Sequence, residues 1–552
     1  MAANPSIQLG TDGNWAIKED NLLAYKKDGT RFFNKEFDFS RNSLATFVDK
    51  DGLIKVSGVT DTELIVNGDL SDGTTNWSEV TGGDATSSTI VSGNGHPTNA
   101  IRYVSIGSSN RAYAFNDTDL YEDGKLYKFE FYYRSDVVIG STGTSASLDW
   151  KSQVGALPIN TGDAIKVSGY VTADSNDNRF AWYTSSTTSP GKFFEISGLS
   201  VVEVQTDVPR IDFKDNTTGH LLLEPQSTNL ITYSEDFSEG IWSKDNVTVT
   251  NGFTSPSGDL SAYKLQPTQT SSVHLLNIAV TSSSVKTYSV FAKQNGYKRF
   301  RFNTSSSSNG YASFDLNNGS IVATGGTFYS SSSIEDYGNG WYKCSMTLLS
   351  NAPNKYNLAI EDDNGAVNFL GDGVSSIYVW GAQVEALPYA TSYIPTSGST
   401  VTRNGEVCNN SGSLQDFNSE EGVLYAEISQ PQGTLGSYLA ISDGNTSNRV
   451  IIGAEGGNIK SFITGSGSSI SMIYSTYNAN TNKVAIKYKS SSASLFYNGS
   501  LVSTTSSAPS MSGLSELKFT SGASGQNFYG KVKNIKVFKR ALSDAELQKL
   551  TT

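Results

Sequence analysis

The 552-residue sequence is short of the residue types from which metal centres, disulfide frameworks and catalytic triads are built. It contains two cysteines, Cys344 and Cys408, and three histidines, His96, His220 and His274. Two cysteines cannot form the set of disulfides that holds small secreted domains together. Three histidines far apart in the sequence leave few parts for a zinc site or a histidine-based triad.

Charge is scarce as well. Charged residues make up 17% of the chain, against about 25% in ordinary proteins, and the net charge is −12. Because lysine and arginine supply most of the affinity for phosphate backbones, we expect no nucleic acid among the partners. No stretch approaches 18 apolar residues, so we expect no membrane insertion. The start, MAANPSIQLGTDGNW, lacks the basic and apolar regions of a signal peptide.

What the sequence does contain favours β-structure. Aromatic residues reach 11%, with 28 Tyr and 26 Phe, and 52 glycines accompany abundant serine, threonine and asparagine. Aromatic residues are favoured in strands, and glycine and the small polar residues in turns. The length corresponds to about three or four domains. We therefore predict an all-β chain of several β-sandwich domains in tandem.

Two segments of the chain repeat each other. ELIVNGDLSDGTTNW at 64–78 and NLITYSEDFSEGIW at 229–242 share an apolar start, an acidic turn and a tryptophan. Each is followed by an alternating strand, at 126–133 and 287–293, and ends on a strand interrupted by glycine, at 193–204 and 376–387. The pattern predicts two copies of one sandwich, at 64–205 and 229–390.

A third sandwich is expected at 412–552. Its strand at 422–428 and its hairpin at 495–502 surround Asn498-Gly499, a pair typical of a type I′ turn. Near the end, Ser543 and Glu546 have the spacing of a capping box, which predicts one short C-terminal helix. The segment 391–411, rich in Pro, Gly and Ser, is interpreted as a linker or an extended strap.

Four segments resemble bacteriophage virion proteins of the tail-fibre and head-fibre type: FDFSRNSLATFVDKDGLI, VPRIDF, LLLEPQSTNLITYSEDFS and VWGAQVEALPYATSYIPTSGSTVTR. In that group the first three blocks run almost continuously, whereas here 64–205 separates them. The resemblance implies that 1–63 and 206–228 form one N-terminal virion-attachment β unit, into which the first sandwich is inserted. It further implies location in the virion, assembly in the host cytoplasm and a homotrimer.

The two sandwiches resemble carbohydrate-binding modules of the jelly-roll kind, and 412–552 resembles concanavalin A-like or laminin-G-like domains. In such modules an acidic segment at the start and an acidic last strand often hold a structural calcium. The start is present as Asn67-Gly68-Asp69 and Ser234-Glu235-Asp236, but Ser197-Gly198 and Trp380-Gly381 replace the acidic pairs. The resemblance therefore suggests a structural calcium, and no cofactor is expected with certainty.

Aromatic side chains opposite an apolar strand face are candidates for stacking on sugars, and the alternative is packing between domains or chains or a place in the core. The candidates are Tyr132, Trp182, Phe291 and Trp341. Trp77, Trp242 and Trp380 belong to the repeated segments and are interpreted as core. Two acidic clusters are candidate calcium ligands, with solvated turns as the alternative. They are Glu361, Asp362 and Asp363 in the first cluster, and Asp443 and Asn445 in the second.

We expect no enzyme, because 412–552 lacks two carboxylates at the spacing of a glycoside hydrolase. The leading hypothesis is a virion fibre protein that docks on other virion proteins through its N-terminus and binds host surface glycans. Its N-terminal aromatics suggest the docking patch: Trp15, Phe32, Phe33, Phe37 and Phe39. Alternatives are a capsid decoration protein without a receptor role, a polysaccharide depolymerase with binding modules, and a bacterial adhesin or lectin.

Overall fold

The computed structural model confirms an all-β chain in which every pair of strands is antiparallel. It describes residues 4–10, 15–18, 21–24, 37–79, 86–105, 113–117, 121–139, 150, 156–173, 179–183, 190–214, 218–430, 437–474, 481–521 and 526–552. Among these residues there is one helix, α2 (Asp544–Thr551). No helix in the described ranges is long and apolar enough to cross a membrane.

The chain divides into two compact units, one formed by 58–206 with 397–399 and the other by the rest. The first unit, which we call the inserted sandwich, has its two ends side by side, because the N–H of Gln205 donates to the carbonyl of Gly58 at 2.8 Å. Adjacent termini allow such a unit to interrupt another one without disturbing it.

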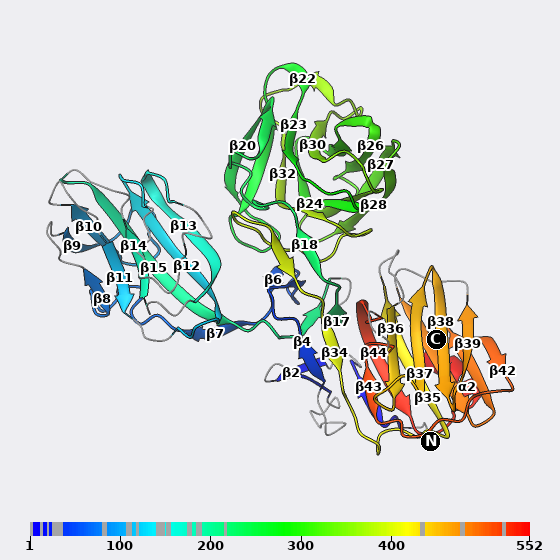
Figure 1. Cartoon of the computed structure of the whole chain (residues 1–552). Coiled ribbons are helices and arrows are strands. Elements are labelled where there is room, and N and C mark those ends of the chain that lie inside the picture. The colour runs from blue at the N-terminus through cyan, green and yellow to red at the C-terminus, as the bar shows by residue number, and fades with distance from the viewer. Residues whose placement is uncertain are drawn as a thin grey trace. The chain divides into compact units, whose positions relative to one another are not determined.

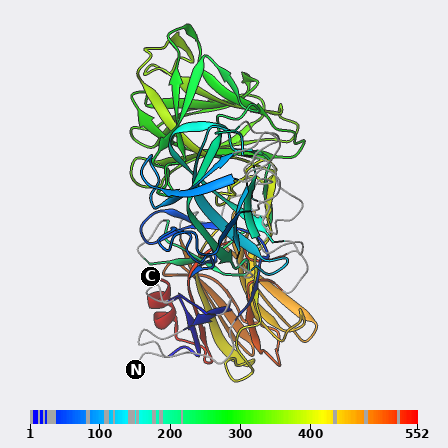
Figure 2. The ribbon, with the colours of Figure 1, turned by 90° about the vertical axis from the view of Figure 1, so that its left-hand side faces the viewer.

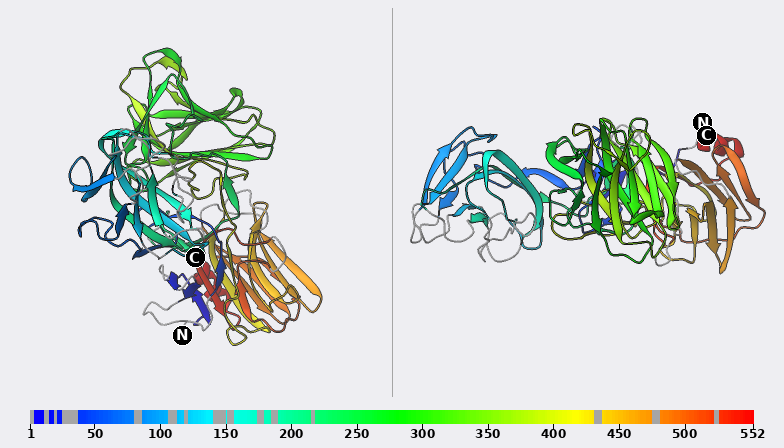
Figure 3. Two further views of the ribbon diagram at one scale, coloured as in Figure 1. Left: turned by 60° about the vertical axis from the view of Figure 1, so that its left-hand side comes forward. Right: turned by 90° about the horizontal axis from the view of Figure 1, so that it is seen from above.

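The inserted sandwich, blue to teal in Figure 3, consists of two sheets. The larger sheet contains, in order, β13 (Asn160–Thr172), β12 (Leu126–Ser135), β15 (Phe193–Val204), β10 (Ala100–Ser105) and β9 (Thr86–Val91), with β7 (Val59–Glu63) also on β15. The smaller contains β14 (Arg179–Tyr183), β11 (Tyr113–Asp117) and β8 (Trp77–Glu79). The alternation predicted for β12 is confirmed: Tyr127, Phe129, Phe131 and Tyr133 lie in the core between the sheets.

The second sandwich, green in Figures 1 and 2, has two six-stranded sheets around a separate core. We call them the covered sheet and the polar sheet. The covered sheet contains β20 (Val247–Phe253), β21 (Ala262–Pro267), β32 (Ser376–Glu385), β24 (Lys286–Asn295), β29 (Tyr342–Leu348) and β28 (Tyr329–Asp336). The polar sheet contains β19 (Ser243–Asp245), β23 (Leu275–Ala279), β30 (Lys355–Glu361), β25 (Arg299–Thr304), β26 (Ser306–Asp315) and β27 (Ser320–Gly325). β22 (Ser271–Val273) and β31 (Asn368–Leu370) form a small ladder beside them.

The two sandwiches share details that follow from the repeated segments. The indole N–H of Trp77 donates to the carbonyl of Asn67 at 2.9 Å, and that of Trp242 to the carbonyl of Tyr233 at 3.0 Å. Both tryptophans are core residues, as predicted. Each closing strand carries a β-bulge at its glycine, which has φ +56° at Gly198 and +62° at Gly381. Such φ values strain any residue with a Cβ, which accounts for glycine in both strands.

The C-terminal domain is also a sandwich. Its larger sheet contains β16 (Arg210–Asp212), β17 (His220–Leu223), β44 (Gly530–Phe538), β35 (Glu421–Ser429), β40 (Asn482–Lys489), β41 (Ser492–Tyr497) and β42 (Ser500–Thr505), with β1 (Ile7–Leu9) on β44. The other contains β39 (Ser468–Tyr474), β38 (Asn458–Gly465), β37 (Arg449–Glu455), β36 (Ser437–Ser442) and β43 (Glu516–Lys518). Two local predictions are confirmed. Asn498 and Gly499 both have positive φ, as a type I′ turn requires, and the Ser543–Glu546 capping box is formed.

Segments far apart in the sequence complete this domain and connect it to the second sandwich. The remaining pairs are β2 (Trp15–Lys18) with β3 (Asn21–Ala24), β4 (Asp38–Ser40) with β34 (Val407–Asn409), β5 (Thr46–Val48) with β6 (Ile54–Val56), and β18 (Ser227–Asn229) with β33 (Val401–Arg403). Two parts of the expected N-terminal unit, 37–58 and 207–228, lie side by side, since the N–H of Phe213 donates to the carbonyl of Val48 at 2.9 Å. In the sheet, however, β17 pairs with β44, and β16 pairs with β17.

One sequence-based interpretation is wrong here, and the structure decides between two alternatives for another segment. Phe37 and Phe39 do not form an exposed docking patch, because both are buried in the core of the C-terminal domain. Trp15 begins β2, and Phe32 and Phe33 lie outside the described residues. The segment 391–411 is a buried strap rather than a solvated linker, since Thr391, Tyr393 and Arg403 are almost fully buried.

A buried group of charged side chains holds the strap against the N-terminal segments. Both carboxylate oxygens of Glu406 accept from Arg210, at 2.9 and 2.5 Å, and one also accepts from Arg41 at 3.0 Å. Glu224 is bonded to Arg210 and to Arg403, at 2.9 Å in each pair. We call these five residues the arginine–glutamate network.

The network sets the ionisation of its own members. Burial alone would raise the pKa of Glu224 and Glu406, but the arginines outweigh it and hold both below the ordinary 4.5. Burial lowers the pKa of Arg41 to about 10, which still leaves this arginine charged near neutral pH. Glu224, Glu406 and Arg41 are therefore all charged near neutral pH.

Replacing Glu406 by Gln should destabilise the protein strongly at pH 7, because Arg41 and Arg210 then lose a buried counter-charge. The cost expected for breaking a buried ion pair is about 3–5 kcal/mol, measurable by denaturant unfolding. Because the folded-state pKa values of Glu224 and Glu406 are depressed, wild-type stability should be fully present above pH 4.5 and fall as the pH drops below it. The exposed ion-pair variant Asp363→Asn is the control and should change stability by less than about 0.5 kcal/mol. An unchanged unfolding free energy in Glu406→Gln would contradict the role given to the network.

Leu9→Ala should destabilise the C-terminal domain, although Leu9 lies over 400 residues before it. Leu9 pairs with Ile535 and is buried in that domain's core. Truncating a buried leucine costs about 2–5 kcal/mol. The control Leu414→Ala removes an exposed leucine and should be nearly neutral. Equal unfolding midpoints for the two variants would show that β1 does not contribute to the sheet.

Candidate functional site

The outer face of the covered sheet is aromatic, but the protein's own chain lies on it. Alternation points Phe291 and Trp380 outward, and Trp341 lies beside them. Val48 and Ile54 from the β5–β6 hairpin and Tyr393 from the strap pack on these rings. Tyr393 is 4.5 Å from Trp380 between ring centroids. Phe291 and Trp341 are therefore buried, which overturns their prediction as sugar-stacking residues and favours the packing alternative.

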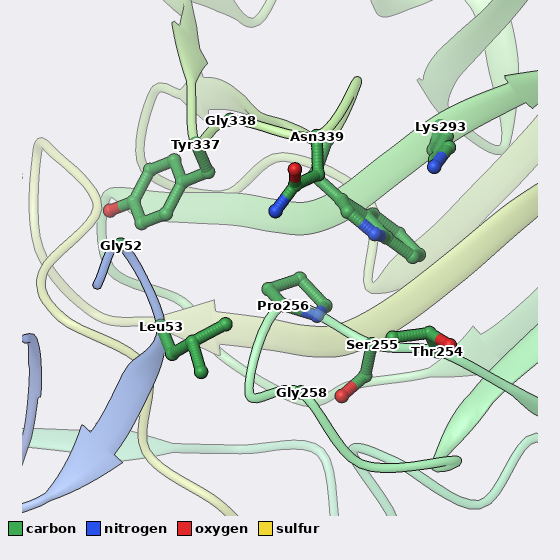
Figure 4. Close-up of a pocket in the computed structure, with 11 residues that line it drawn as sticks. Gly52, Leu53, Thr254, Ser255, Pro256, Gly258, Lys293, Tyr337, Gly338 and Asn339 are labelled. Carbon is green, nitrogen blue, oxygen red and sulfur yellow. The ribbon is translucent and has the colours of Figure 1, made fainter.

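A small pocket remains where this cover ends (Figure 4). Gly52 and Leu53 of the hairpin turn face Pro256, with Tyr337, Asn339 and Lys293 around them. Its volume is about 110 Å³, whereas small-molecule sites usually have about 300–1,000 Å³. The pocket is too small to be the main site for an oligosaccharide.

Trp182, the third predicted stacking residue, also has no accessible face. It belongs to the core of the inserted sandwich and stacks on Trp77 at 5.8 Å between centroids. The prediction is wrong because Trp182 points inward from β14, toward Phe129 and Phe131. Tyr132 alone among the four is half-buried on an outer face, that of β12.

The predicted calcium ligands are engaged in other contacts. Asp362 accepts the backbone N–H groups of Asn364 and Ala366, and Asp443 accepts that of Asn445, as in solvated turns. Asp363 is paired with Lys298 at 3.4 Å, and Glu361 is buried away from both aspartates. Among the described residues there is no group of three or more His, Cys, Asp or Glu that could hold a metal ion.

In the second sandwich, the position at which the module resemblance implies calcium does not fit the ion either. Tyr393 donates its hydroxyl to Glu235 at 2.9 Å and is 2.6 Å from the hydroxyl of Ser234. Burial and the nearby carboxylate of Asp259 raise the pKa of Glu235 to about 7. A phenol donor and a carboxyl that readily takes a proton are unsuited to a hard cation. The strap fills this position instead.

The polar sheet offers the best candidate site, because alternation places polar groups on its outer face. In β25, Phe300 and Phe302 point into the core, and Arg299, Arg301 and Asn303 point outward. The register of the strands aligns four polar side chains across the sheet in one row, which we call the amide row: Asn277, Asn357, Asn303 and Tyr311. The amide of Asn357 donates to Asn303 at 2.7 Å, and that of Asn277 donates to Asp245 at 3.0 Å.

The amide row ends on an aromatic ring held in place by its neighbours. Tyr311 lies opposite Gly325, where a Cβ would be 3.1 Å from the ring. The guanidinium of Arg301 is 4.6 Å from the centroid of the same ring. Tyr311 is half-buried, so part of the ring is accessible to solvent.

A second, charged row runs beside the amide row. Arg301 is paired with Glu361 at 2.6 Å, and Arg299 with Asp315 at 3.2 Å. Ser313 also donates to Glu361, at 2.8 Å. Burial raises the pKa of Glu361 although Arg301 opposes the shift.

Two oxygens on this face are buried without a hydrogen-bond partner in the described part of the chain. They are Oδ1 of Asn357 and Oε2 of Glu361. A buried acceptor left unsatisfied costs about 1–3 kcal/mol. Both residues belong to β30 on the same face, with the small side chain of Ala359 between them. Each oxygen therefore lacks a hydrogen-bond donor, which a hydroxyl group can supply.

One family model matches part of the chain. Residues 425–548 match the concanavalin A-like lectin/glucanases superfamily (Laminin_G_3), which confirms the prediction for the C-terminal domain. No curated protein matches the chain.

Three solved structures represent the similarities in fold. The CBM40 of the Ruminococcus gnavus IT-sialidase, bound to α2,3-sialyllactose, is 17% identical, with 26% of this chain and 94% of that chain covered and a TM-score of 0.23. The CBM22-1–CBM22-2 tandem of Paenibacillus barcinonensis Xyn10C is 11% identical, with coverages of 60% and 98% and a TM-score of 0.21. Domains LG4-5 of the mouse laminin α1 chain are 10% identical, with coverages of 50% and 89% and a TM-score of 0.19. Similarity at this level says nothing about a ligand of this chain.

Proposed function

We propose that this chain is a non-enzymatic glycan-binding protein and that its second sandwich holds sugar hydroxyls on the amide row. The observation that carries the proposal is the alignment of three amides with Tyr311, beside two buried oxygens without partners. The match of the C-terminal domain to a lectin superfamily supports the same class of ligand.

The chemistry of the amide row suits a carbohydrate. An amide offers both a donor and an acceptor, as a sugar hydroxyl does, so neighbouring amides complement neighbouring hydroxyls. The exposed part of the Tyr311 ring provides an apolar surface for the C–H face of a sugar. Each new hydrogen bond replaces one to water, so a single site should bind weakly. Several copies on one particle would strengthen attachment by raising the effective concentration.

The proposal is of binding without hydrolysis. A glycosidase needs one carboxyl that donates a proton and a second that acts as nucleophile or base. On this face Glu361 and Asp315 are each paired with an arginine, which supports a positioning role for both. The alternative, a depolymerase, would release reducing ends from host polysaccharide, and the purified protein should release none.

We further propose that the protein is a tail-fibre or head-fibre component of a bacteriophage virion. The support is the resemblance of its connecting segments to such proteins. In this role the chain forms a homotrimer, since cyclic symmetry closes identical interfaces, and it docks on other virion proteins through its N-terminal part. The docking surface excludes Phe37 and Phe39, which are core residues. A capsid decoration protein without a receptor role is the alternative.

Asn303→Ala and Asn357→Ala should each weaken binding to the glycan that the wild-type protein selects on a glycan array. Losing one or two hydrogen bonds should weaken binding by about tenfold. The matched control Asn318→Ala removes an exposed asparagine from a turn of the same sandwich. Thermal unfolding should show all three variants folded. Unchanged affinity in both amide-row variants would overturn the assignment of this face.

Antibodies against the chain should label purified phage particles in immunogold microscopy if the virion role is right. The position of the label, at the tail or on the head, distinguishes the two fibre types. Sedimentation of the purified protein at micromolar concentration should give the mass of a trimer. Particles without label would contradict the virion role, and a monomer would contradict an autonomous trimer.

A further inference from the structure

Three segments far apart in the sequence enclose the small pocket of Figure 4. They are the turn of the β5–β6 hairpin, the loop between β20 and β21, and the turn between β28 and β29, and β24 contributes Lys293. Leu53 and Pro256 lie on one side of the space (Figure 4). Tyr337 and Asn339 lie opposite them. We call this space the hairpin pocket.

Contacts between the hairpin and the β20–β21 loop hold the walls of the hairpin pocket in place. The N–H of Ile54 donates to the carbonyl of Pro256 at 3.0 Å. The side chain of Leu53 packs against Gly258, where a Cβ would be only 3.2 Å from Cδ1 of the leucine. Because these contacts exist before a ligand arrives, little order has to be created on binding.

The floor of the hairpin pocket is apolar and its rim is polar. Pro256 and Trp341 are the buried apolar residues that line it, whereas Thr254 and Asn339 are exposed. Neither the Thr254 hydroxyl nor the Asn339 amide has a hydrogen-bond partner among the described residues. A hydroxyl and an amide can each donate to and accept from the hydroxyl groups of a ligand.

One of the residues that line the hairpin pocket is charged, and it has no counter-charge. This residue is Lys293, which forms no ion pair or hydrogen bond within the described ranges and is half-buried. Its carbon stem lies against Gly340, where a Cβ would be 3.5 Å from Cε of the lysine. The ammonium therefore has a restricted position and donors to spare, which a carboxylate would receive as charge-assisted hydrogen bonds.

The turns around the hairpin pocket, and the segments packed on them, carry charges of both signs. Three of the aspartates accept hydrogen bonds within their own turns. Because opposite charges are close to balance, an anion is not drawn in by the surroundings, and its binding depends on direct contact with Lys293. The acidic residues are Asp49, Asp51, Asp259 and Asp336, and the basic ones are Lys50, Lys55, Lys214 and Lys293.

The size of the hairpin pocket suits one ring rather than a chain of sugars. An apolar cavity of about 150 Å³ holds one benzene molecule. The hairpin pocket has about 110 Å³ and is open to solvent at its exposed rim, so a single sugar ring can enter it in part.

We propose that the hairpin pocket binds one sugar unit that carries a carboxylate, such as a uronic acid. The C–H face of the ring lies on the apolar floor, and the carboxylate pairs with Lys293. Thr254 and Asn339 bond to the hydroxyl groups. The choice of a sugar rests on the proposed glycan-binding function, but the pocket shares no residue with the amide row.

The test measures the binding of three probes to the full chain by ligand-observed NMR titration: glucuronate, glucose and sulfate. Glucuronate should bind with a Kd in the millimolar range. Glucose and sulfate should each bind at least fivefold more weakly, because each makes only part of the contacts. Lys293→Gln should weaken glucuronate binding about tenfold, since a charge-assisted hydrogen bond is lost, and should leave glucose binding unchanged.

Two further variants separate specific contacts from general effects. Lys264→Gln is the matched control, because Lys264 and Lys293 pair with Tyr378 from opposite sides and Lys264 does not line the pocket. It should change glucuronate binding less than twofold. Asn339→Gly removes the amide from a residue with φ +53°, a conformation that glycine adopts freely, so the variant should fold. It should weaken glucuronate binding about threefold.

Several results would overturn the proposal. They are no binding of glucuronate, equal weakening in Lys264→Gln and Lys293→Gln, unchanged binding in Asn339→Gly, and binding of glucose or sulfate as tight as that of glucuronate. Loss of glucuronate binding in Asn357→Ala, with none in Lys293→Gln, would assign the probe to the amide row instead. Failure of the amide-row variants on the glycan array would contradict the proposed function of that row and leave glucuronate binding in the hairpin pocket intact, so the two proposals fail separately.

Discussion

Three buried arginines share two buried glutamates, and this network determines how the large unit of the chain is assembled. Arg41, Arg210 and Arg403 come from three distant segments and meet on Glu224 and Glu406. Removing five charges from water is expensive, and the cost is offset only if every partner is present with good geometry. The N-terminal segments and the strap must therefore be in place together. An apolar contact between these segments would allow them to slide past each other, whereas the paired charges allow one arrangement of the segments.

The arginine–glutamate network decides which surface of the second sandwich is available. It fixes the strap that carries Tyr393 and the hairpin that carries Val48 and Ile54, and these segments cover the aromatic face of the covered sheet. The sandwich is then left with the outer face of its polar sheet, on which Arg301, Asn303 and Tyr311 are half-exposed. The amides and paired ions there are suited to hydroxyl groups. The distribution of polar and aromatic residues between the two faces thus follows from the way the chain is joined.

Much of the fold could be predicted from local patterns, and much of the site could not. Alternation predicted β12 and its core face, and the Asn498-Gly499 turn and the Ser543 cap were recognisable because each depends on neighbouring residues. The same alternation in RFRFNT could have indicated Asn303 as an outward residue. It could not have aligned Asn303 with Asn277 and Asn357, since that alignment depends on the register of strands up to 80 residues apart. The burial of Phe291 was unpredictable for a similar reason, because its cover comes from 46–56 and 391–396.

The two bulges show how one framework yields two kinds of surface. Gly198 and Gly381 have nearly the same backbone conformation, and each places an aromatic residue of the neighbouring strand on the outer face. An aromatic ring in that position has a large apolar area that water solvates poorly, so it favours any partner that covers it. In the second sandwich the partner is the protein's own strap. At the other bulge a polar segment of the chain lies instead, because His96 bonds to Ser197 and Glu195, and Pro97 lies beside Gly198. The residues beside each ring therefore decide which kind of segment lies there, an apolar strap in one sandwich and a hydrogen-bonded polar segment in the other.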